Sequence, residues 1–251
     1  MIDVQEASAR ARELGIDPAY VERDHLLCSV LAAIADTESR LVFRGGTALS
    51  RVYWPDFRMS EDLDFLGDLP GSDLERTLSH AVGSAAGQGS FDLEFRFGAP
   101  KRGWSRSVVR AGDTQIIIDV NSDDRPYLAA QELPLHLPYS DLQDRERTIP
   151  VVALAEIMGN KWFMLGDDDR KEPRDLYDVW SGLTRFGVPF GELARGHRAK
   201  YGVNPSEGQL RRAQRLEDLW QTRLGHQLAG LPPFGEVLAA VRKRFERWRA
   251  P

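Results

Sequence analysis

Two aspartates separated by one residue, Asp62 and Asp64, lie in the apolar segment DLDFL at residues 62–66. On a β-strand, side chains two positions apart point to the same face, so both carboxylates would face the same way. Like charges this close raise the pKa of one group unless a cation neutralises them. Carboxylate oxygens suit Mg²⁺, with Mn²⁺ as a substitute, together with water and phosphate oxygens. A strand edge at which both acids are solvated is the alternative.

A third aspartate, Asp119, lies in the segment TQIIIDVN at residues 114–121. Alternation places Ile116 and Ile118 on one face of the expected strand and Asp119 on the other. A carboxylate in so apolar a strand is unfavourable unless it binds a charge. If this strand lies beside the first, Asp119 becomes a third ligand, and three acids can hold two metal ions that activate the attacking oxygen and stabilise the leaving group. The alternative is a strand-end aspartate that meets solvent.

Gly45, Gly46 and Thr47 stand directly before a helix-like segment. Glycines let the backbone approach a ligand, and the first turn of a helix presents N–H groups to phosphates. Thr47 is the expected N-cap of that helix. A simple tight turn also accounts for these residues. Together with Asp-x-Asp, which begins fifteen residues after Thr47, they indicate a phosphate site beside a metal site, as nucleotidyl transfer requires.

A lysine, Lys161, lies on the apolar stripe of the expected helix over residues 151–165. Such a lysine either extends its ammonium to solvent at the edge of the interface or meets negative charge, for example a triphosphate. A second helix is expected over residues 173–186. Asp175 lies there beside the apolar stripe, and Arg174 and Asp178 have the spacing of an ion pair.

The elements that must position these residues form an α+β fold with a mixed or antiparallel sheet and helices on one side. Helices are expected over residues 19–39, 72–86 and 234–250, and strands over residues 41–43, 60–67, 91–97, 104–111 and 114–122. After Pro150 the chain is almost entirely helix or loop. We therefore expect a catalytic core with an N-terminal helix at residues 1–150, and a helical lobe at residues 151–251 that closes the nucleotide site.

Composition limits the possible classes of protein. The chain has 251 residues, a formal net charge of −5 and one cysteine, Cys28, which lies in a helix-like apolar segment. The net charge argues against a protein that coats nucleic acid, although basic residues cluster near 101–110, 195–200, 211–215 and 242–249. No apolar run is long enough to span a membrane, and the start has no signal-peptide core. A cytoplasmic protein is expected.

The segment FRGGTALSRVYWPDFRMSEDLDF at residues 43–65 resembles the opening motif of the AbiEii/AbiGii-type toxins, which include the MenT toxins. These toxins belong to the DNA polymerase β-like nucleotidyltransferase superfamily, and the resemblance extends from residue 21 through the C-terminal helices. It implies transfer of a nucleotide from an NTP with Mg²⁺, for several members to the 3′ end of tRNA. It also implies a cognate antitoxin encoded alongside.

The resemblance assigns roles to particular residues. The first motif corresponds to Gly46, Thr47, Asp62 and Asp64, Lys161 corresponds to a catalytic lysine, and Asp175 would orient that lysine or the base, supported by Arg174 and Asp178. The NTP is expected between the lobes, with its phosphates on Gly45 to Thr47 and on Mg²⁺ held by Asp62, Asp64 and Asp119. Two alternatives remain: an aminoglycoside-type nucleotidyltransferase acting on a small molecule, and a catalytically silent module that binds RNA or a partner.

Overall fold

The computed structural model describes residues 2–37, 40–55, 57–89, 92–225, 227–228 and 230–250. It divides into two compact units, Met1–Pro126 with Ala130–Val152 and Tyr127–Ala129 with Ala153–Pro251. The short segment 127–129 joins the second unit because a buried carboxylate, Glu156, accepts hydrogen bonds from the backbone N–H groups of Tyr127 and Leu128 at 2.9 and 3.0 Å.

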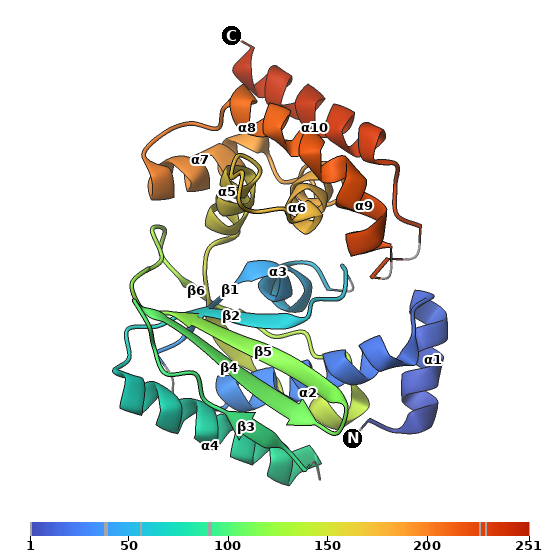
Figure 1. Cartoon of the computed structure of the whole chain (residues 1–251), viewed down its shortest axis with the longest axis vertical. Coiled ribbons are helices and arrows are strands. Elements are labelled where there is room, and N and C mark those ends of the chain that lie inside the picture. The colour runs from blue at the N-terminus through green and yellow to red at the C-terminus, as the bar shows by residue number, and fades with distance from the viewer. Residues whose placement is uncertain are drawn as a thin grey trace. The chain divides into compact units, whose positions relative to one another are not determined.

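The first unit is built on a seven-stranded mixed sheet in the order β3-β4-β5-β2-β1-β7-β6 (Figure 1). The α+β fold class expected from the sequence is confirmed. Strand β2 runs parallel to β5 and antiparallel to β1, and β1 runs parallel to β7. The strand bounds are β1 Val42–Arg44, β2 Asp62–Leu66, β3 Glu94–Arg96, β4 Trp104–Ala111, β5 Thr114–Asn121, β6 Gln131–Pro134 and β7 Thr148–Val151.

Sequence alternation predicted the hairpin β4–β5 accurately and missed the two strands at the other edge. The strand expected over residues 91–97 is observed over Glu94–Arg96, and Phe91 lies outside the described residues. Strands β6 and β7 are four residues long and contain Pro134 and Pro150. Proline interrupts the ladder of hydrogen bonds, and the sequence analysis predicts no strand in either segment. They nevertheless pair with each other, and β7 joins β1.

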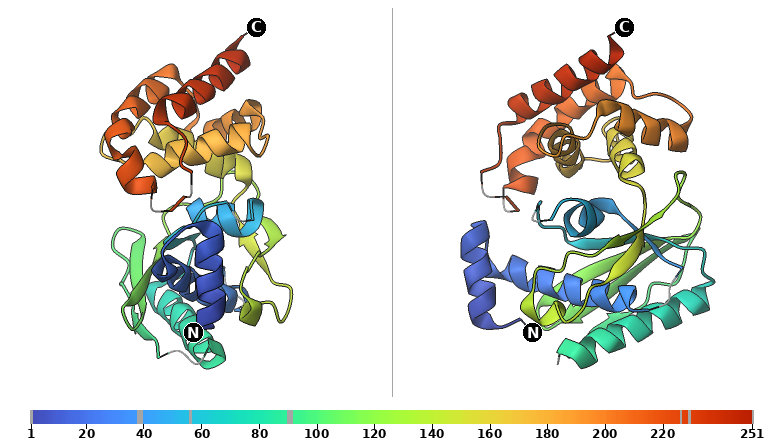
Figure 2. Two further views of the ribbon diagram at one scale, coloured as in Figure 1. Left: turned by 90° about the vertical axis from the view of Figure 1, so that its right-hand side faces the viewer. Right: turned by 180° about the vertical axis from the view of Figure 1, so that it is seen from behind.

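Helices α2 (Pro18–Ala35) and α4 (Gly71–Gly89) lie on one side of the sheet, whereas α3 (Gly45–Ala48) lies on the other (Figures 1 and 2). Helix α1 (Val4–Leu14) packs on α2. The helix expected up to Ser39 ends at Ala35, and Glu38 and Ser39 lie outside the described residues.

Cys28 of α2 is fully buried, as the sequence indicates. Burial raises the pKa of its thiol to about 12. A thiol with so high a pKa stays protonated at neutral pH and is a poor nucleophile, so Cys28 belongs to the core.

The second unit is helical. Its elements are α5 Leu154–Met164, α6 Pro173–Thr184, α7 Phe190–Tyr201, α8 Glu207–Arg212, the 3₁₀ turn η3 Ala213–Leu216, α9 Glu217–Leu224 and α10 Phe234–Arg249. Trp162 of α5 stacks on Phe245 of α10 with ring centroids 5.5 Å apart, and its indole N–H donates to Gln209 at 2.9 Å. The last helix buries Val237, Val241 and Phe245 on one stripe. Within the ranges given above, no helix combines the length and apolar character needed to cross a membrane.

Candidate functional site

A row of four charged residues crosses four adjacent strands of the first unit. The register pairs Arg44 on β1 with Asp64 on β2, Asp64 with Asp119 on β5, and Asp119 with Arg106 on β4. Register partners point to the same face of a sheet. Asp62, two residues before Asp64, shares that face. The sheet therefore places all three sequence-predicted acids on one face, with an arginine at each end of the row.

Asp119 is bound by Arg106 in a bidentate ion pair. The guanidinium Nε and Nη2 donate to the two carboxylate oxygens at 2.9 and 2.8 Å. The carboxyl side chain of Asp119 is 6% exposed, whereas that of Arg106 is 60% exposed. The hydrogen bond to Asp119 is the main cause of the raised pKa of Arg106, and the charges of Asp62 and Asp64 raise it further. The charges of all three acids therefore act on the guanidinium of Arg106.

Two of the three acids are suited to bind a divalent cation. Over the part of the chain that the structure describes, no three His, Cys, Asp or Glu side chains come together as a ready-made metal site. Mg²⁺ usually takes one or two carboxylates and completes its octahedron with water and substrate phosphate oxygens. Asp62 and Asp64 supply such a pair. Each oxygen of Asp119 keeps a lone pair besides the one that Arg106 uses, so Asp119 as a third ligand stays a prediction.

The glycine segment lies directly against these acids. Gly45 has φ +82°, a left-handed conformation that favours glycine. A Cβ atom at Gly45 would lie 2.3 Å from Oδ2 of Asp64, and one at Gly46 would lie 2.7 Å from Nη2 of Arg58. The conformation of Gly45 favours glycine, and a side chain at Gly46 would displace the Arg58 guanidinium.

Thr47 does not cap the helix, so the sequence prediction on this point is wrong. Helix α3 begins at Gly45 with Arg44 in the N-cap position, and Thr47 lies inside it. The left-handed Gly45 turns the chain into the helix three residues earlier than expected. The buried Thr47 hydroxyl donates to the carbonyl oxygen of Asp62 at 2.5 Å, which ties the glycine segment to β2. A π-helix, η1 (Leu49–Tyr53), follows and was not predicted.

Arg58 was missed by the sequence analysis. It is buried, its Nη1 donates to the carbonyl oxygen of Met59 at 2.9 Å, and its Nη2 lies beside Gly46. The available signal was a charge between the two apolar residues Phe57 and Met59, close to Asp-x-Asp. A buried guanidinium beside a glycine backbone is well suited to bind an anion.

In the second unit, Lys161 is buried within a group of acids. Its Nζ lies 2.6 Å from Oδ2 of Asp178 and 3.2 Å from Oδ1 of Asp175, both on α6. Arg170 donates to the other oxygen of Asp175 at 2.7 Å. Lys161 is 7% exposed, so it does not extend to solvent, and its contact with a triphosphate stays a prediction. Arg174, the fourth residue expected here, bonds Glu172 at 2.8 Å.

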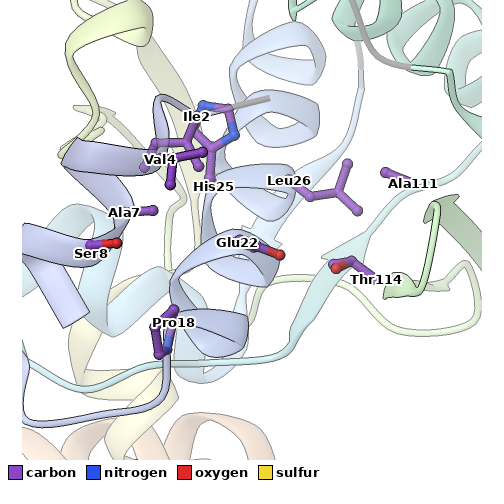
Figure 3. Close-up of a pocket in the computed structure, with 10 residues that line it drawn as sticks. All are labelled: Ile2, Val4, Ala7, Ser8, Pro18, Glu22, His25, Leu26, Ala111 and Thr114. Carbon is purple, nitrogen blue, oxygen red and sulfur yellow. The ribbon is translucent and has the colours of Figure 1, made fainter.

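A separate cavity of about 270 Å³ lies between α1, α2 and the turn that joins β4 to β5 (Figure 3). Its lining is mostly apolar and includes Ile2, Val4, Leu26 and Ala111. None of the sequence-predicted site residues lines it. Ala111 and Thr114 are at the end of the β4–β5 hairpin opposite to Trp104 and Asn121, so this cavity is distinct from the row of acids.

The fold and the acid-bearing sheet define the class of this protein: it is a nucleotidyltransferase. A family model described as "Nucleotidyl transferase AbiEii toxin, Type IV TA system" matches residues 26–248, so the chain belongs to this family. Membership makes it a nucleotidyltransferase toxin of a toxin–antitoxin system, with an NTP substrate and a cognate antitoxin. No protein with a curated description matches the sequence.

Solved structures share the fold. MenT4, a nucleotidyltransferase toxin from Mycobacterium tuberculosis H37Rv, is 21% identical with a TM-score of 0.67, and the match covers 95% of this chain and 88% of MenT4. JHP933 from Helicobacter pylori is 16% identical with a TM-score of 0.55, and the match covers 92% of each chain. At these identities the likeness concerns the fold alone.

Proposed function

We propose that this protein transfers a nucleotide from an NTP to the 3′ end of tRNA in the cytoplasm, with Mg²⁺ or, in its place, Mn²⁺. The observation that carries the proposal is the register of Asp64 beside Asp119, with Asp62 on the same face and the glycine segment against Asp64. Asp62 and Asp64 would hold the metal, which supplies charge neutralisation for the phosphates when bound.

The phosphates of the NTP would lie on the glycine side of the row. Gly45 and Gly46 carry no side chain that would block a close approach, and Arg58 offers a guanidinium next to Gly46. A guanidinium donates to two phosphate oxygens at once. These residues would hold the triphosphate beside the carboxylates.

The reaction is a nucleophilic displacement at the α-phosphorus of the NTP. A 3′ hydroxyl oxygen of the acceptor forms a bond to the α-phosphorus, the bond from that phosphorus to the bridging oxygen breaks, and pyrophosphate leaves with the electron pair. The hydroxyl proton passes to water. The family resemblance gives Lys161 a catalytic role, and Asp175 and Asp178 hold its ammonium in place.

Arginines beside the acids bear on the choice between a nucleic acid and a small cationic acceptor. The acids are flanked by Arg44 on one side and Arg106 on the other. An aminoglycoside is a polycation and gains most from an acidic surface, whereas an RNA backbone gains from guanidinium groups. Arg106 is the more exposed of the two, at 60%, and its guanidinium supports RNA as the acceptor.

The test is transfer of label from each of the four NTPs to total tRNA by the purified full-length protein. We expect labelled RNA with Mg²⁺, none after chelation with EDTA, and a loss of at least 100-fold in Asp64→Asn. Asp113→Asn, at an exposed aspartate in the β4–β5 turn, is the matched control and should keep full activity. No labelling by the wild-type protein with any NTP, or equal labelling by Asp64→Asn, contradicts the proposal.

A further inference from the structure

The row of acids has an exposed aromatic side chain at one end. Trp104 is the first residue of β4 and pairs in register with Asn121 of β5. This pair lies two residues along the strands from the Arg106–Asp119 pair. Because Trp104 and Arg106 are two residues apart, they share the face that carries Asp119 and Asp64. Trp104 is 40% exposed, although tryptophan is usually well covered in a folded protein.

The backbone holds Trp104 firmly. Its N–H donates to the carbonyl oxygen of Lys101 at 3.0 Å, and its own carbonyl oxygen accepts from the Lys101 N–H at 2.8 Å. Ser122 N–H donates to the carbonyl oxygen of Gly103 at 2.7 Å, which fixes the turn to the end of β5. The exposed ring is therefore presented by a hydrogen-bonded turn and not by a loose loop.

Positively charged residues stand close to Trp104 in the chain. Arg106 on the same strand is largely exposed, and Lys101 and Arg102 in the preceding turn are exposed as well. Aromatic rings bordered by lysine and arginine are the combination with which proteins bind single-stranded nucleic acid: bases stack on the ring, and the cations meet the phosphates.

The order of the strands indicates whether the NTP or the RNA acceptor would lie on the side of Trp104. The glycine segment follows β1, the acids lie on β2 and β5, and Trp104 lies on β4, in the spatial order β1-β2-β5-β4. In phosphoryl transfer the attacking and leaving oxygens lie roughly in line across the phosphorus. If pyrophosphate leaves on the glycine side, the acceptor must approach from the side of β4.

We propose that Trp104 is the stacking platform for the 3′-terminal base of the RNA acceptor, with the exposed edge of Arg106 against the last phosphate. This inference rests on the proposed function and adds to it the residues that receive the acceptor. Trp104 is a binding residue here: it orients the terminal ribose so that its hydroxyl faces the acids, and it takes no part in bond making.

The first experiment measures binding without requiring transfer. An acceptor-stem RNA whose last base is 2-aminopurine is titrated with full-length protein, and quenching of the fluorescence reports stacking. We expect quenching by the wild-type protein and by Trp104→Phe, and roughly tenfold weaker binding by Trp104→Ala, since one base–aromatic stack changes affinity by about that factor. Phe186→Ala, at an exposed aromatic residue of the second unit, is the matched control and should bind as the wild type does.

The second experiment measures steady-state transfer. Trp104→Ala should raise KM for the RNA roughly tenfold and leave KM for the NTP unchanged, and Trp104→Phe should restore most of the difference. Unchanged quenching and unchanged KM for RNA in Trp104→Ala overturn the inference. An increase in KM for the NTP alone also overturns it, because the ring would then hold the incoming base.

The two experiments separate this inference from the proposed function. If the wild-type protein transfers no nucleotide but quenches the probe in a Trp104-dependent way, the proposed transfer fails and the RNA platform stands. If the wild-type protein transfers normally and Trp104→Ala transfers with the same KM, the platform fails alone.

Discussion

Arg51 and Asp24 form a buried ion pair that joins the π-helix η1 to helix α2. Burial alone would lower the pKa of Arg51, but the charge and hydrogen bond of Asp24, together with Cys28 and Tyr139, outweigh burial and raise that pKa. Tyr139 donates its hydroxyl to the other oxygen of Asp24 at 2.6 Å. Because η1 continues directly from the helix that contains Gly45, this pair also anchors the glycine segment.

Removing one member of this pair should destabilise the protein strongly. Arg51→Met leaves the carboxylate of Asp24 buried without its main cation, and we expect the free energy of unfolding to fall by about 3–5 kcal/mol. The double variant Asp24→Leu/Arg51→Met leaves no charge behind and should recover most of that loss. Urea denaturation of both variants is the measurement. A double variant as unstable as Arg51→Met would show that packing, and not the uncompensated charge, governs this site.

Gly45→Ala should impair the site more than it impairs the fold. The left-handed φ costs about 1–2 kcal/mol for a residue with a Cβ, and that atom would also push against the Asp64 carboxylate. We expect a modest loss of stability together with a loss of transfer activity of at least tenfold. Gly112→Ala is the matched control: Gly112 also has a positive φ, +57°, but open space around it. Equal activity of the two variants would contradict a role for the close approach at Gly45.

The charge network around Lys161 has separable structural and chemical consequences. Lys161→Met removes a buried cation from between Asp175 and Asp178 and should lower the free energy of unfolding by about 3–5 kcal/mol. Lys161→Met/Asp178→Leu should regain stability, since Arg170 still pairs with Asp175. Both variants should remain inactive in transfer if the ammonium acts on the nucleotide. Thermal unfolding and transfer assays on both proteins provide the comparison, and recovery of activity in the double variant would limit Lys161 to a structural role.

A buried histidine should make stability depend on pH. His197 donates from Nδ1 to the carbonyl oxygen of Val203 at 2.7 Å and accepts at Nε2 from the Gln209 amide at 3.0 Å, and burial lowers its pKa below 6.5. As pH falls below 6.5, the unfolded chain binds a proton that the folded chain does not, so the free energy of unfolding decreases.

The variant His197→Asn keeps a donor near Nδ1 and has no group that titrates. We expect urea denaturation between pH 7.5 and pH 5.5 to show a smaller decrease for His197→Asn than for the wild-type protein, by up to about 1.4 kcal/mol per pH unit. Identical decreases in both proteins would exclude His197 as a source of this pH dependence.

The sequence by itself determined which side of each strand the key residues occupy. In residues 104–111 and 114–121 the alternation of apolar and polar residues was sufficient, because side chains on a strand alternate between faces and a short turn joins the two strands. The position of Lys161 on the apolar stripe of its helix followed from periodicity in the same way. The family followed from the motif at residues 43–65 and is confirmed.

Only the tertiary structure decided which residues meet across the sheet. Alternation assigns Asp64 and Asp119 to faces, but the parallel pairing of β2 with β5 joins segments that are distant in the chain, and no local pattern specifies that register. The same holds for Arg58 beside Gly46 and for Arg106 bound to Asp119. Periodicity records the environment of one element, whereas the contacts between elements arise from the packing of the whole unit.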